Sequence, residues 1–500
     1  MNAADLAVFD ALFRSVAEEM GFALERAATS TNIKERRDLS CAVFDEEGRL
    51  LAQAAHIPVH LGAMPLSVRA VLERRPPGPG DVILLNDPWA GGTHLPDVTA
   101  VTRAGRFLLA NRAHHADIGG AAPGSLGLAH DIHGEGLRIP PVRIVRGGRM
   151  DEDLLDLFCA NVRSPQERRE DLVAQVATLK RGVVRLEEAA RRHGETTLIA
   201  AGAALREAAR LAAVAVVRSL RPGVHTFEDF LDGGFGVRVA LAVRGDRLVA
   251  DFTGTHPQVS VPLNANLAVV WSAVTYALAL LLPEETPLNE GVRDVIEIIA
   301  PEGTLVNARY PAPVAGGNVE TSQRLVDVVL GALASALPGA IPAASQGTMN
   351  NLTVGGEGFT YYETIAGGAG GGPDGPGASA LQTHMTNTRN TPIEALENAM
   401  PLLVRRLQVA RGTGGAGLYA GGDGVVKEIE FLAPCLAHLL SDRRTRGPYG
   451  LGGGSAGTPG SASLLRDGVE LQLEGRARIE ARAGDRLAIR TPGGGGFGKV

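Results

Sequence analysis

Apolar runs with the periods of strands and of helices alternate along this 500-residue chain, and glycine-rich segments separate them. Glycine is unusually frequent, with 64 residues, whereas aromatic residues make up only 4%. Glycine is costly to order, so this abundance indicates many tight turns and close approaches of one backbone to another. Because the glycines lie between periodic segments and form no repeat, we expect a folded protein of mixed α/β (α+β) class.

Residues 1–30 are predicted to form an amphipathic helix and not a targeting segment. The segment contains acidic residues and lacks both a basic start and an unbroken apolar stretch. One stripe of this helix carries the large apolar side chains Leu6, Phe9, Phe13, Val16 and Met20. The longest apolar run, 267–283, is short for a membrane span, so we expect a buried helix there and no contact with a membrane.

A capping sequence marks the longest predicted helix. The run Ser164-Pro165-Gln166-Glu167 has the pattern of a capping box with proline at the first helical position. This helix should end near Gly194, because glycine is a common C-terminal cap. Further helices are predicted at 196–220, 265–282 and 392–409.

Predicted strands surround these helices. They lie at 41–44, 49–52, 81–85 and 106–110, within 222–262, and from 424 to the last residue. The chain is too long for one simple core, so we expect a large multi-layer protein with mixed sheets. Three regions are predicted: an N-terminal region 1–262 with a helical insert at 164–220, a central glycine-rich α/β region 263–423, and a strand-rich C-terminal region 424–500.

Charge and cysteine usage exclude several classes of function. The formal net charge of -6 disfavours nucleic-acid binding, which normally needs a basic surface. The three cysteines lie far apart and form no CxxC pair, which fits a reducing compartment, so we expect a cytoplasmic protein. The terminal run GGGGFGK resembles a phosphate-binding loop, but Val500 replaces the required Ser or Thr and no helix follows. Any ATP chemistry must therefore come from a partner.

Histidine and aspartate gather in two segments, each directly after a predicted strand. His94 and Asp97 lie three residues apart in a glycine-rich loop, and His114, His115 and Asp117 follow the next predicted strand. Two imidazoles with one or two carboxylates form a mixed nitrogen and oxygen site that suits Zn, Mn or Fe(II). Such a site leaves positions open for water or substrate. The alternative is that these are ordinary polar residues of surface loops.

Two further carboxylates are candidates for the same chemistry. Asp38 lies just before an apolar strand and could supply another oxygen ligand, although it could equally belong to a solvated helix end. Glu135 lies in a tight glycine turn and is a candidate general base or an acceptor for a ligand histidine. A turn carboxylate without a role is the alternative for Glu135.

Several long motifs occur in the order of a known family and span nearly the whole chain. They include ERAATSTNIKERRDLSCAVFD, GDVILLNDPWAGGTHLPDVT, NRAHHADIGG, HGEGLRIPPVRI, GGNVETSQRLVD and TNTRNTPIEALEN. In these motifs the chain resembles the hydantoinase B/oxoprolinase family. That family includes N-methylhydantoinases, 5-oxoprolinases, lactam-opening enzymes, and the acetone and acetophenone carboxylases.

The resemblance implies a metal-binding catalytic subunit of an ATP-dependent cyclic amide hydrolase. A separate ATP-binding partner of the hydantoinase A type would phosphorylate the carbonyl oxygen of a cyclic amide or ureide. The phosphorylated substrate would then pass to a divalent metal on this subunit, where water attacks. Two alternatives stay open: a subunit of an ATP-dependent ketone carboxylase, and a non-catalytic subunit that only assembles with the ATP-binding partner.

The resemblance also implies roles for single residues. The metal ligands would be Asp38, His94, Asp97 and His114. The segment between Asp97 and His114 is shorter than is usual in the family, which leaves His115 open as the ligand in place of His114.

Other residues would act around the metal. His115 and Asp117 would orient ligands, and Glu135 would be the acid/base. Asn318 and Glu320 match a family motif that we expect to contact the substrate. The glycine-rich runs 367–372 and 414–415 could let backbone N–H groups approach a phosphate, with flexible connection as the alternative.

Overall fold

A computed structural model describes residues 1–54 and 57–500 and has the expected mixed α+β class. The family motifs quoted above lie within this part. Ala55 and His56, which follow the first motif, lie outside the described residues. Within this part, no helix combines the length and apolarity needed to cross a membrane. The helices are α1 Ala3–Ala27, α2 Thr31–Lys34, α3 Met64–Arg74, α4 Glu152–Cys159, α5 Pro165–His193, α6 Glu195–Ser219, α7 Leu267–Ala279, α8 Glu290–Arg293, α9 Ser322–Ala336 and α10 Ile393–Ala399.

The N-terminal part forms an antiparallel sheet of seven strands in the order β2-β1-β5-β4-β3-β6-β7. Its central pair is β4 and β5, and their register places Asp97 opposite His114. Strand β1 pairs with the other edge of β5, so Leu39 lies opposite Ala113. The strands are β1 Leu39–Asp45, β2 Leu50–Gln53, β3 Val82–Leu85, β4 Asp97–Ala104, β5 Phe107–His114, β6 Val142–Arg146 and β7 Arg149–Met150.

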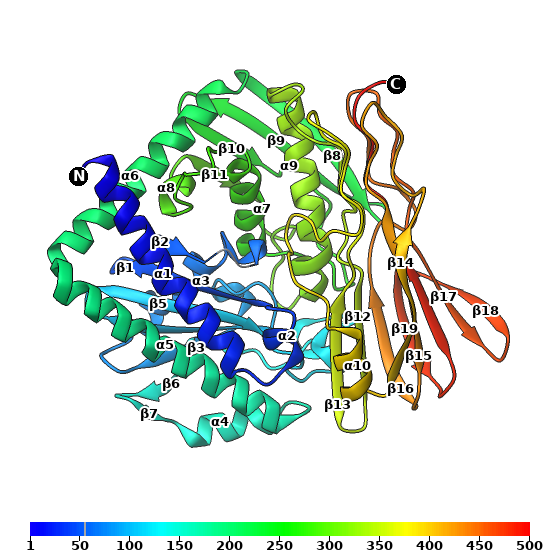
Figure 1. The fold of residues 1–500 in the computed structure, drawn as a ribbon, viewed down its shortest axis with the longest axis horizontal. Helices are drawn as coiled ribbons and strands as arrows, with labels where there is room; N and C mark the ends of the chain where they lie inside the picture. The colour runs from blue at the N-terminus through cyan, green and yellow to red at the C-terminus, as the bar shows by residue number, and fades with distance from the viewer. Residues whose placement is uncertain (55–56) are drawn as a thin grey trace.

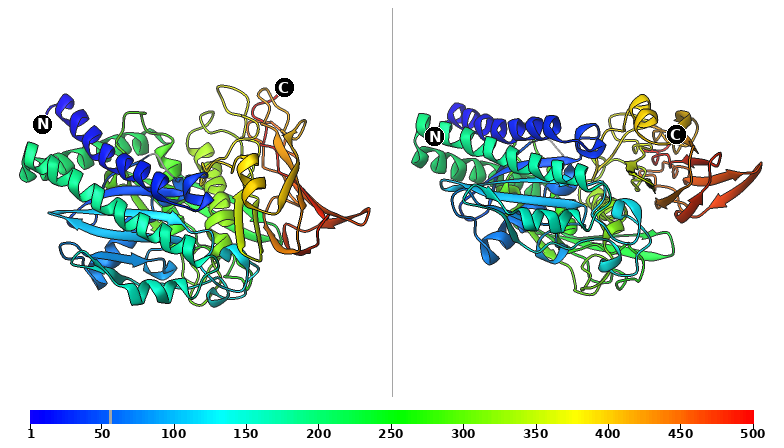
Figure 2. Two further views of the ribbon diagram at one scale, coloured as in Figure 1. Left: turned by 60° about the horizontal axis from the view of Figure 1, so that its bottom comes forward. Right: turned by 90° about the horizontal axis from the view of Figure 1, so that it is seen from below.

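Helices cover both faces of this sheet. α1 and α5 lie across one face (Figures 1 and 2), where they share an apolar core with strands β1, β4 and β5. The predicted stripe of α1 faces this core: Phe9, Phe13, Val16 and Met20 are buried and Leu6 is half-buried. On the opposite face α3 packs against β4 and β5 through a smaller apolar cluster. The sheet is therefore buried on both sides.

A second, four-stranded sheet has the order β11-β10-β9-β8 and is mixed, because β10 and β11 run parallel. α9 packs on β8 and β9, and α7 packs against α9, as Figure 1 shows. The apolar run at 267–283 is thus a buried helix, as predicted, and it belongs to the largest apolar core. The strands are β8 Gly223–Leu231, β9 Phe235–Arg244, β10 Arg247–Asp251 and β11 Ile296–Ile299.

The C-terminal part consists of two antiparallel sheets packed on a shared apolar core. One sheet has the order β13-β12-β16-β19 and the other has the order β14-β15-β20-β17-β18. The predicted strand-rich character of the C-terminal region is confirmed, and Figure 1 shows these sheets at one end of the molecule. The strands are β12 Asn351–Gly356, β13 Phe359–Thr364, β14 Leu402–Ala410, β15 Gly424–Phe431, β16 Cys435–Leu440, β17 Ser461–Arg466, β18 Val469–Leu473, β19 Arg476–Ala481 and β20 Arg486–Arg490.

Two predictions about helices are wrong in detail. The segment 392–409 is not one helix, because α10 ends at Ala399 and β14 follows. Pro401 explains the break, since the residue before a proline is pushed out of the helical region, and Met400 is extended at φ -128° and ψ 149°. Ser164 makes no capping bond and has the left-handed φ of 54°, although the helix does begin at Pro165 and is capped by Gly194.

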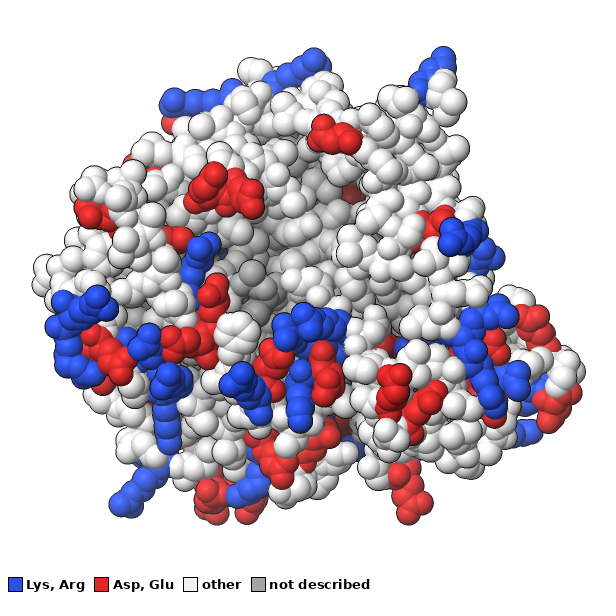
Figure 3. Space-filling model, in the orientation of Figure 1, with Lys and Arg blue, Asp and Glu red and all other residues white. Residues whose placement is uncertain are grey.

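The glycine-rich runs are neither flexible connections nor open loops. Segments near 368, 415, 422 and 494 bond backbone to backbone: Gly494 donates to Gly422, and Gly415 donates to Gly494. A Cβ at Gly494 would lie 2.0 Å from the carbonyl oxygen of Ala369, so only glycine fits there. These segments carry few charges, and Figure 3 shows that most charged side chains on this face lie elsewhere. The three predicted regions remain a prediction.

Candidate metal centre

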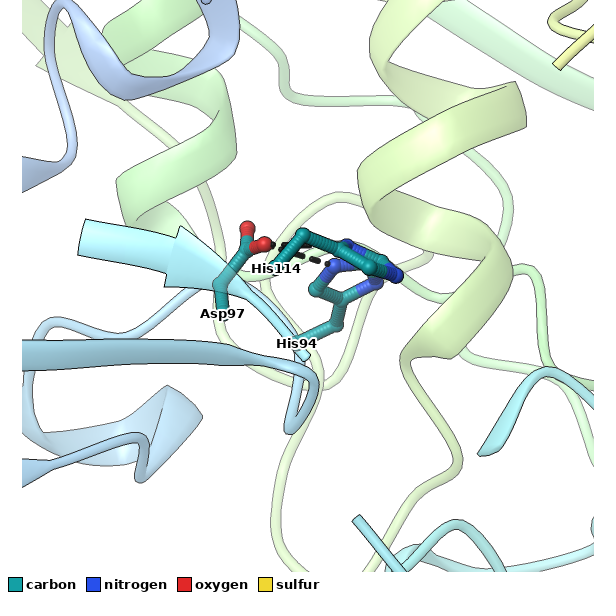
Figure 4. A group of neighbouring side chains, drawn as sticks. All are labelled: His94, Asp97 and His114. Carbon is teal, nitrogen blue, oxygen red and sulfur yellow. Dashed lines mark hydrogen bonds and ion pairs between the residues drawn. The ribbon is translucent and has the colours of Figure 1, made fainter. Parts of the chain in front are cut away.

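His94, Asp97 and His114 converge in the interior of the molecule. One nitrogen of each imidazole and one oxygen of the carboxylate all lie within 4.8 Å of one another (Figure 4). His94 Nε2 and His114 Nδ1 each lie 3.2 Å from the same oxygen, Asp97 Oδ1. The imidazole centroids are 5.0 Å apart. Two sequence-distant histidines thus face one carboxylate at a spacing that a single cation could bridge.

The sheet itself produces this convergence. Asp97 is the first residue of β4 and His114 is the last residue of β5, and the antiparallel register places them opposite each other. His94 lies in the turn that leads into β4, where its carbonyl oxygen accepts a hydrogen bond from the Asp97 N–H. All three side chains are almost fully buried.

A small cavity adjoins the three side chains. Its volume is about 20 Å³, which is enough for one water molecule or one ion, since a water needs about 10–15 Å³. The polar residues that line it are Asp38, His60, His94, Asp97, His114, Asn318, Tyr362, Thr364 and Thr386. The cavity therefore has the size and the polarity of a site for a single ion or water molecule.

Asp38 lies at the border of this group. It precedes β1, its carbonyl oxygen accepts a hydrogen bond from the His114 N–H, and its Oδ2 lies 4.0 Å from His114 Nδ1. Asp38 lines the cavity but does not belong to the group of three side chains whose ligand atoms all lie within 4.8 Å of one another. Its role as a fourth metal ligand remains a prediction.

The hydrogen-bonding pattern fits a cation. His94 Nδ1 faces the carbonyl oxygen of Ala315 at 3.4 Å, which leaves the lone pair of Nε2 on the side of Asp97. Ligand histidines commonly donate their second N–H to a backbone carbonyl in this way. Two buried atoms at the site, His114 Nε2 and Asn318 Oδ1, have no hydrogen-bond partner among the described residues. Buried polar atoms without partners are rare, and an ion or water with its shell would satisfy them.

The electrostatics favour an ionised carboxylate at the centre. Burial opposes ionisation of Asp97, but the adjoining His94 and His60 and the hydrogen bond from His114 hold its pKa well below the usual value. Burial lowers the pKa of His60, although the nearby Asp97 acts in the opposite direction. An ionised, buried carboxylate is the form that binds a divalent cation.

Of the two neighbouring histidines, His114 faces the cluster and His115 faces away from it. His115 Nε2 lies 2.9 Å from Gln175 Oε1 on α5, and its ring packs edge-on against Phe158. Burial lowers the pKa of His115 to about 4. The backbone explains the difference, because consecutive residues at a strand end point to opposite faces of the sheet.

Asp117 also lies outside the cluster. Its carboxylate accepts hydrogen bonds from the N–H groups of Gly119, Gly124 and Arg163 and from the Arg163 side chain. These contacts fix the loop after β5. Orientation of the metal ligands by Asp117 remains a prediction.

Glu135 is buried but does not line the cavity. Its Oε1 accepts a hydrogen bond from the Ala315 N–H, and the carbonyl of the same residue faces His94. Burial raises the pKa of Glu135 to about 8. Glu135 is thus connected to the cluster through the backbone of one residue, Ala315, and its acid/base role remains a prediction.

The two residues of the GGNVETSQRLVD motif take different places. Asn318 lines the cavity, where its Nδ2 lies 3.1 Å from His94 Nε2 and 3.4 Å from Asp97 Oδ2. Glu320 lies farther away and accepts hydrogen bonds from the Met349 N–H and from Asn351. Burial raises the pKa of Glu320 to about 8. Only Asn318 is in position to touch a ligand in the cavity.

His60 is a member of the site that the sequence reasoning missed. Its Nε2 lies 3.3 Å from Asp97 Oδ2, and its Nδ1 lies 2.7 Å from Ser40 Oγ. Tyr362, also missed, stacks its ring on His114 with centroids 4.7 Å apart. The histidine-containing run HIPVHLG at 56–62 was a usable signal for His60. For Tyr362 the sequence offers no comparable signal.

Comparison with known sequences identifies relatives over the full length. The family model described as hydantoinase B/oxoprolinase matches residues 2–500. The 5-oxoprolinase 1 of Arabidopsis thaliana is 41% identical over 537 residues, which cover 99% of this chain and 42% of that protein. A putative D-/L-hydantoinase subunit of Pseudomonas sp. (strain NS671) is 30% identical over 521 residues, which cover 97% of this chain and 88% of that protein. The chain therefore spans less than half of the 5-oxoprolinase but most of the Pseudomonas protein.

Comparison with solved structures gives the same picture. The ATP-dependent caprolactamase from Pseudomonas jessenii superposes with a TM-score of 0.93 at 27% identity, covering 100% of this chain and 91% of that one. An acetone carboxylase in its nucleotide-free form superposes with a TM-score of 0.91 at 17% identity, covering 99% of this chain and 76% of that one. At such low identity the second likeness concerns the fold alone.

Proposed function

Because this chain belongs to the hydantoinase B/oxoprolinase family, we propose that it is the metal-binding subunit of an ATP-dependent enzyme that hydrolyses a cyclic amide. The observation that carries the proposal is the buried convergence of His94, Asp97 and His114. The relatives support the reaction class, because a 5-oxoprolinase, a hydantoinase subunit and a caprolactamase are named for cyclic amide or ureide substrates.

The proposed ligands are His94, Asp97, His114 and Asp38, and the ion would be Zn, Mn or Fe(II). When bound, such an ion supplies Lewis acidity and a hydroxide nucleophile near neutral pH, since coordination lowers the pKa of water to about 7 in favourable sites. His94 would bind through Nε2 while Nδ1 donates to Ala315. The donor set accepts each of the three ions.

The surrounding residues would orient these ligands and keep the site dry. Thr93 donates a hydrogen bond of 2.6 Å to Asp97 Oδ2, and His60 lies against the same oxygen. Both contacts hold the carboxylate so that Oδ1 faces the two imidazoles. The burial of all these side chains excludes bulk water, which strengthens the interaction of charges in the cavity.

Activation of the substrate would come from a partner. A cyclic amide resists attack because resonance stabilises its carbonyl group, and phosphorylation of the carbonyl oxygen creates a leaving group. No convincing nucleotide-binding fingerprint occurs in the sequence. We propose a hydantoinase A-type partner that uses ATP and delivers the phosphorylated substrate, and the naming of the Pseudomonas relative as one subunit of a hydantoinase supports this.

The test is reconstitution with the candidate partner. The two chains are co-expressed and purified, the bound metal is quantified, and ATP consumption is measured with a panel of hydantoins, 5-oxoproline and lactams. We expect about one divalent metal per chain, and ATP consumption that needs a cyclic amide but no bicarbonate. Dependence on bicarbonate would indicate a ketone carboxylase instead. A complex that forms without stoichiometric metal would indicate an assembly subunit.

A cytoplasmic location and the lack of nucleic-acid partners remain predictions.

A further inference from the structure

We infer that the Thr386 hydroxyl is an obligate hydrogen-bond donor to an anionic oxygen bound in the cavity, and that Arg36 fixes this polarity through a chain of threonine hydroxyls. The inference rests on the proposed function, because the anionic oxygen would belong to the substrate as it is hydrolysed. It concerns residues that lie outside the proposed ligand set.

Arg36 is a buried cation without an acidic partner. Its side chain is fully buried, and within the described residues no carboxylate oxygen lies within ion-pairing distance of it. The guanidinium lies over the Tyr362 ring at 4.6 Å and donates to the Tyr362 carbonyl oxygen. Its second nitrogen, Nη2, donates to Thr364 Oγ1 at 3.2 Å and to Thr388 Oγ1 at 3.4 Å. The positive charge is thus directed at threonine hydroxyls.

The first link has only one possible polarity. Thr364 Oγ1 accepts from Arg36 and also from Gln382 Nε2 at 3.0 Å. The orientation of this amide follows from its second contact, with the Thr364 carbonyl oxygen, which needs a donor. A hydroxyl oxygen has two acceptor positions, and both are now filled. Thr364 must therefore donate its own proton to Thr388 Oγ1, which lies 2.8 Å away.

The same count fixes the remaining links. Thr388 Oγ1 accepts from Thr364 and from Arg36, so it must donate to Thr386 Oγ1 at 3.2 Å. Thr386 Oγ1 accepts this proton and also accepts from the Thr388 N–H at 3.4 Å. Its two acceptor positions are filled as well. Among the four linked groups, which all belong to the described residues, the proton of Thr386 is the one for which no partner is found, and Thr386 lines the cavity.

The chemistry of Thr386 follows from this count. It can act neither as a metal ligand nor as a base, because both roles need a free lone pair. It can only donate, and a chain of donors that starts at a cation strengthens the last donor. Its partner is then an anionic oxygen in the cavity. In the proposed reaction this would be an oxygen of the phosphate group, which gains negative charge as water adds to the carbon and the bond from that carbon to the phosphorylated oxygen breaks.

A binding experiment on the single chain tests this inference without any turnover. The chain is loaded with Mn²⁺, and formate, a small carboxylate probe, is titrated by calorimetry. The variants are Thr386→Val, which keeps the shape but removes the proton, and Thr386→Ser, which keeps the hydroxyl. The matched control is Thr360→Val, a buried threonine of β13 that does not line the cavity. Metal content is measured for each variant.

We expect Thr386→Val to bind formate at least about 10-fold more weakly, the size typical of one hydrogen bond to a charged group. The formate affinities of Thr386→Ser and Thr360→Val should stay within about 3-fold of the wild-type value, the size expected of a substitution that removes no important contact. Metal content should be equal in all chains. Equal formate affinity in Thr386→Val and the wild type, loss of metal in Thr386→Val, or no formate binding by the metal-loaded wild type would each overturn the inference.

Kinetics of the reconstituted complex provide the second readout. Thr386→Val should lower kcat about 100-fold with little change in KM, because the bond strengthens only as charge develops, and Thr386→Ser should restore most of it. Thr364→Val should act in the same direction, since it removes the link that carries the polarity from Arg36. A changed KM with an unchanged kcat would contradict the inference. A wild-type complex that hydrolyses no cyclic amide would refute the proposed function, while the formate series would still decide the role of Thr386.

Discussion

The candidate metal centre depends on a few buried nitrogen and oxygen atoms that lie within 4.8 Å of one another. Asp97 receives both imidazoles on a single oxygen, while its second oxygen is held by Thr93 and faces His60. Thr93 and His60 thus hold the carboxylate at Oδ2, and Oδ1 is the oxygen that faces both imidazoles. Replacement of any one side chain that contributes a lone pair should therefore affect metal binding before it affects the fold.

His94→Ala should remove metal binding and turnover together. The change deletes one nitrogen of the cluster, so metal content should fall from about one per chain to near zero, and turnover of the reconstituted complex at least about 100-fold, more than residues that only orient ligands usually cost. Metal analysis, turnover and circular dichroism check this. His130→Ala, at an exposed histidine, is the matched control and should change none of them. A His94→Ala chain that retains metal and activity would refute the ligand assignment.

Glu135→Gln should change how stability depends on pH. Burial raises the pKa of Glu135 from 4.5 to about 8, so the folded chain holds a proton that the unfolded chain releases between these values. The free energy of unfolding of the wild type should therefore fall as pH rises through this window and level off above it. Glutamine keeps the hydrogen bond from the Ala315 N–H and cannot ionise. The stability of the variant should therefore rise relative to that of the wild type as pH rises.

Thermal melts at about pH 5, pH 7 and pH 9 measure this difference. Glu357→Gln, in an exposed turn, is the control and should follow the wild-type curve. Parallel curves for Glu135→Gln and the wild type would show that Glu135 is ionised in the folded chain.

At the scale of single residues, only site residues that lie close together in the sequence could be predicted. His94, Asp97 and His114 could be predicted because short segments rich in histidine and aspartate follow apolar runs. His60 is separated from Asp97 by 37 positions and Asn318 from His94 by 224, and no pattern in the chain connects them. Their proximity arises because the segments before α3 and before α9 lie beside Asp97 and His94, which spacing does not encode.

At the scale of elements, strand ends and glycine-rich segments set the positions of these side chains. Most helices and strands could be predicted from period and caps, including α1, α5 and α7. The prediction of one helix over 392–409 was wrong because it followed the helical spacing of apolar residues and ignored Pro401, which ends the helix. Strand β14 then forms by pairing with β15, which lies farther along the chain. The glycine-rich segments could not be placed at all, since their partners are other backbone segments and leave no side-chain pattern.

Gly494→Ala should destabilise the protein strongly. The new Cβ would lie 2.0 Å from the Ala369 carbonyl oxygen, so two hydrogen-bonded backbone segments would have to separate. We expect a loss of about 3 kcal/mol or more in the free energy of unfolding, at the upper end of overpacking effects. Gly375→Ala is the matched control, because nothing lies within 4 Å of its Cβ position. Denaturant unfolding of both variants measures this, and similar midpoints would contradict the close packing.

At the scale of the molecule, a buried network of charges joins three parts of the chain. Arg324 and Asp327 lie on α9, Asp229 lies on β8, and Asp442 and Arg443 follow β16. Arg324 donates to Asp229 at 3.0 Å and to Asp442 at 2.8 Å. The network therefore connects the mixed sheet, the helix that follows Asn318, and the C-terminal sheets.

Arg443→Met should loosen this connection between the C-terminal sheets and the rest of the chain. Arg443 donates to Asp229 at 2.7 Å and to Asp327 at 2.6 Å, and all three side chains are largely buried. Methionine fills a similar volume but leaves Asp327 with a single, longer ionic contact, and breaking a buried pair in this way typically costs about 3–5 kcal/mol. Denaturant unfolding should show this loss, and Asp327→Asn should recover part of it in the double variant. Arg478→Met is the control, because its pair with Glu480 is exposed and should contribute about 1 kcal/mol or less. If Arg443→Met and Arg478→Met lose the same free energy of unfolding, the buried network does not hold the C-terminal sheets in place.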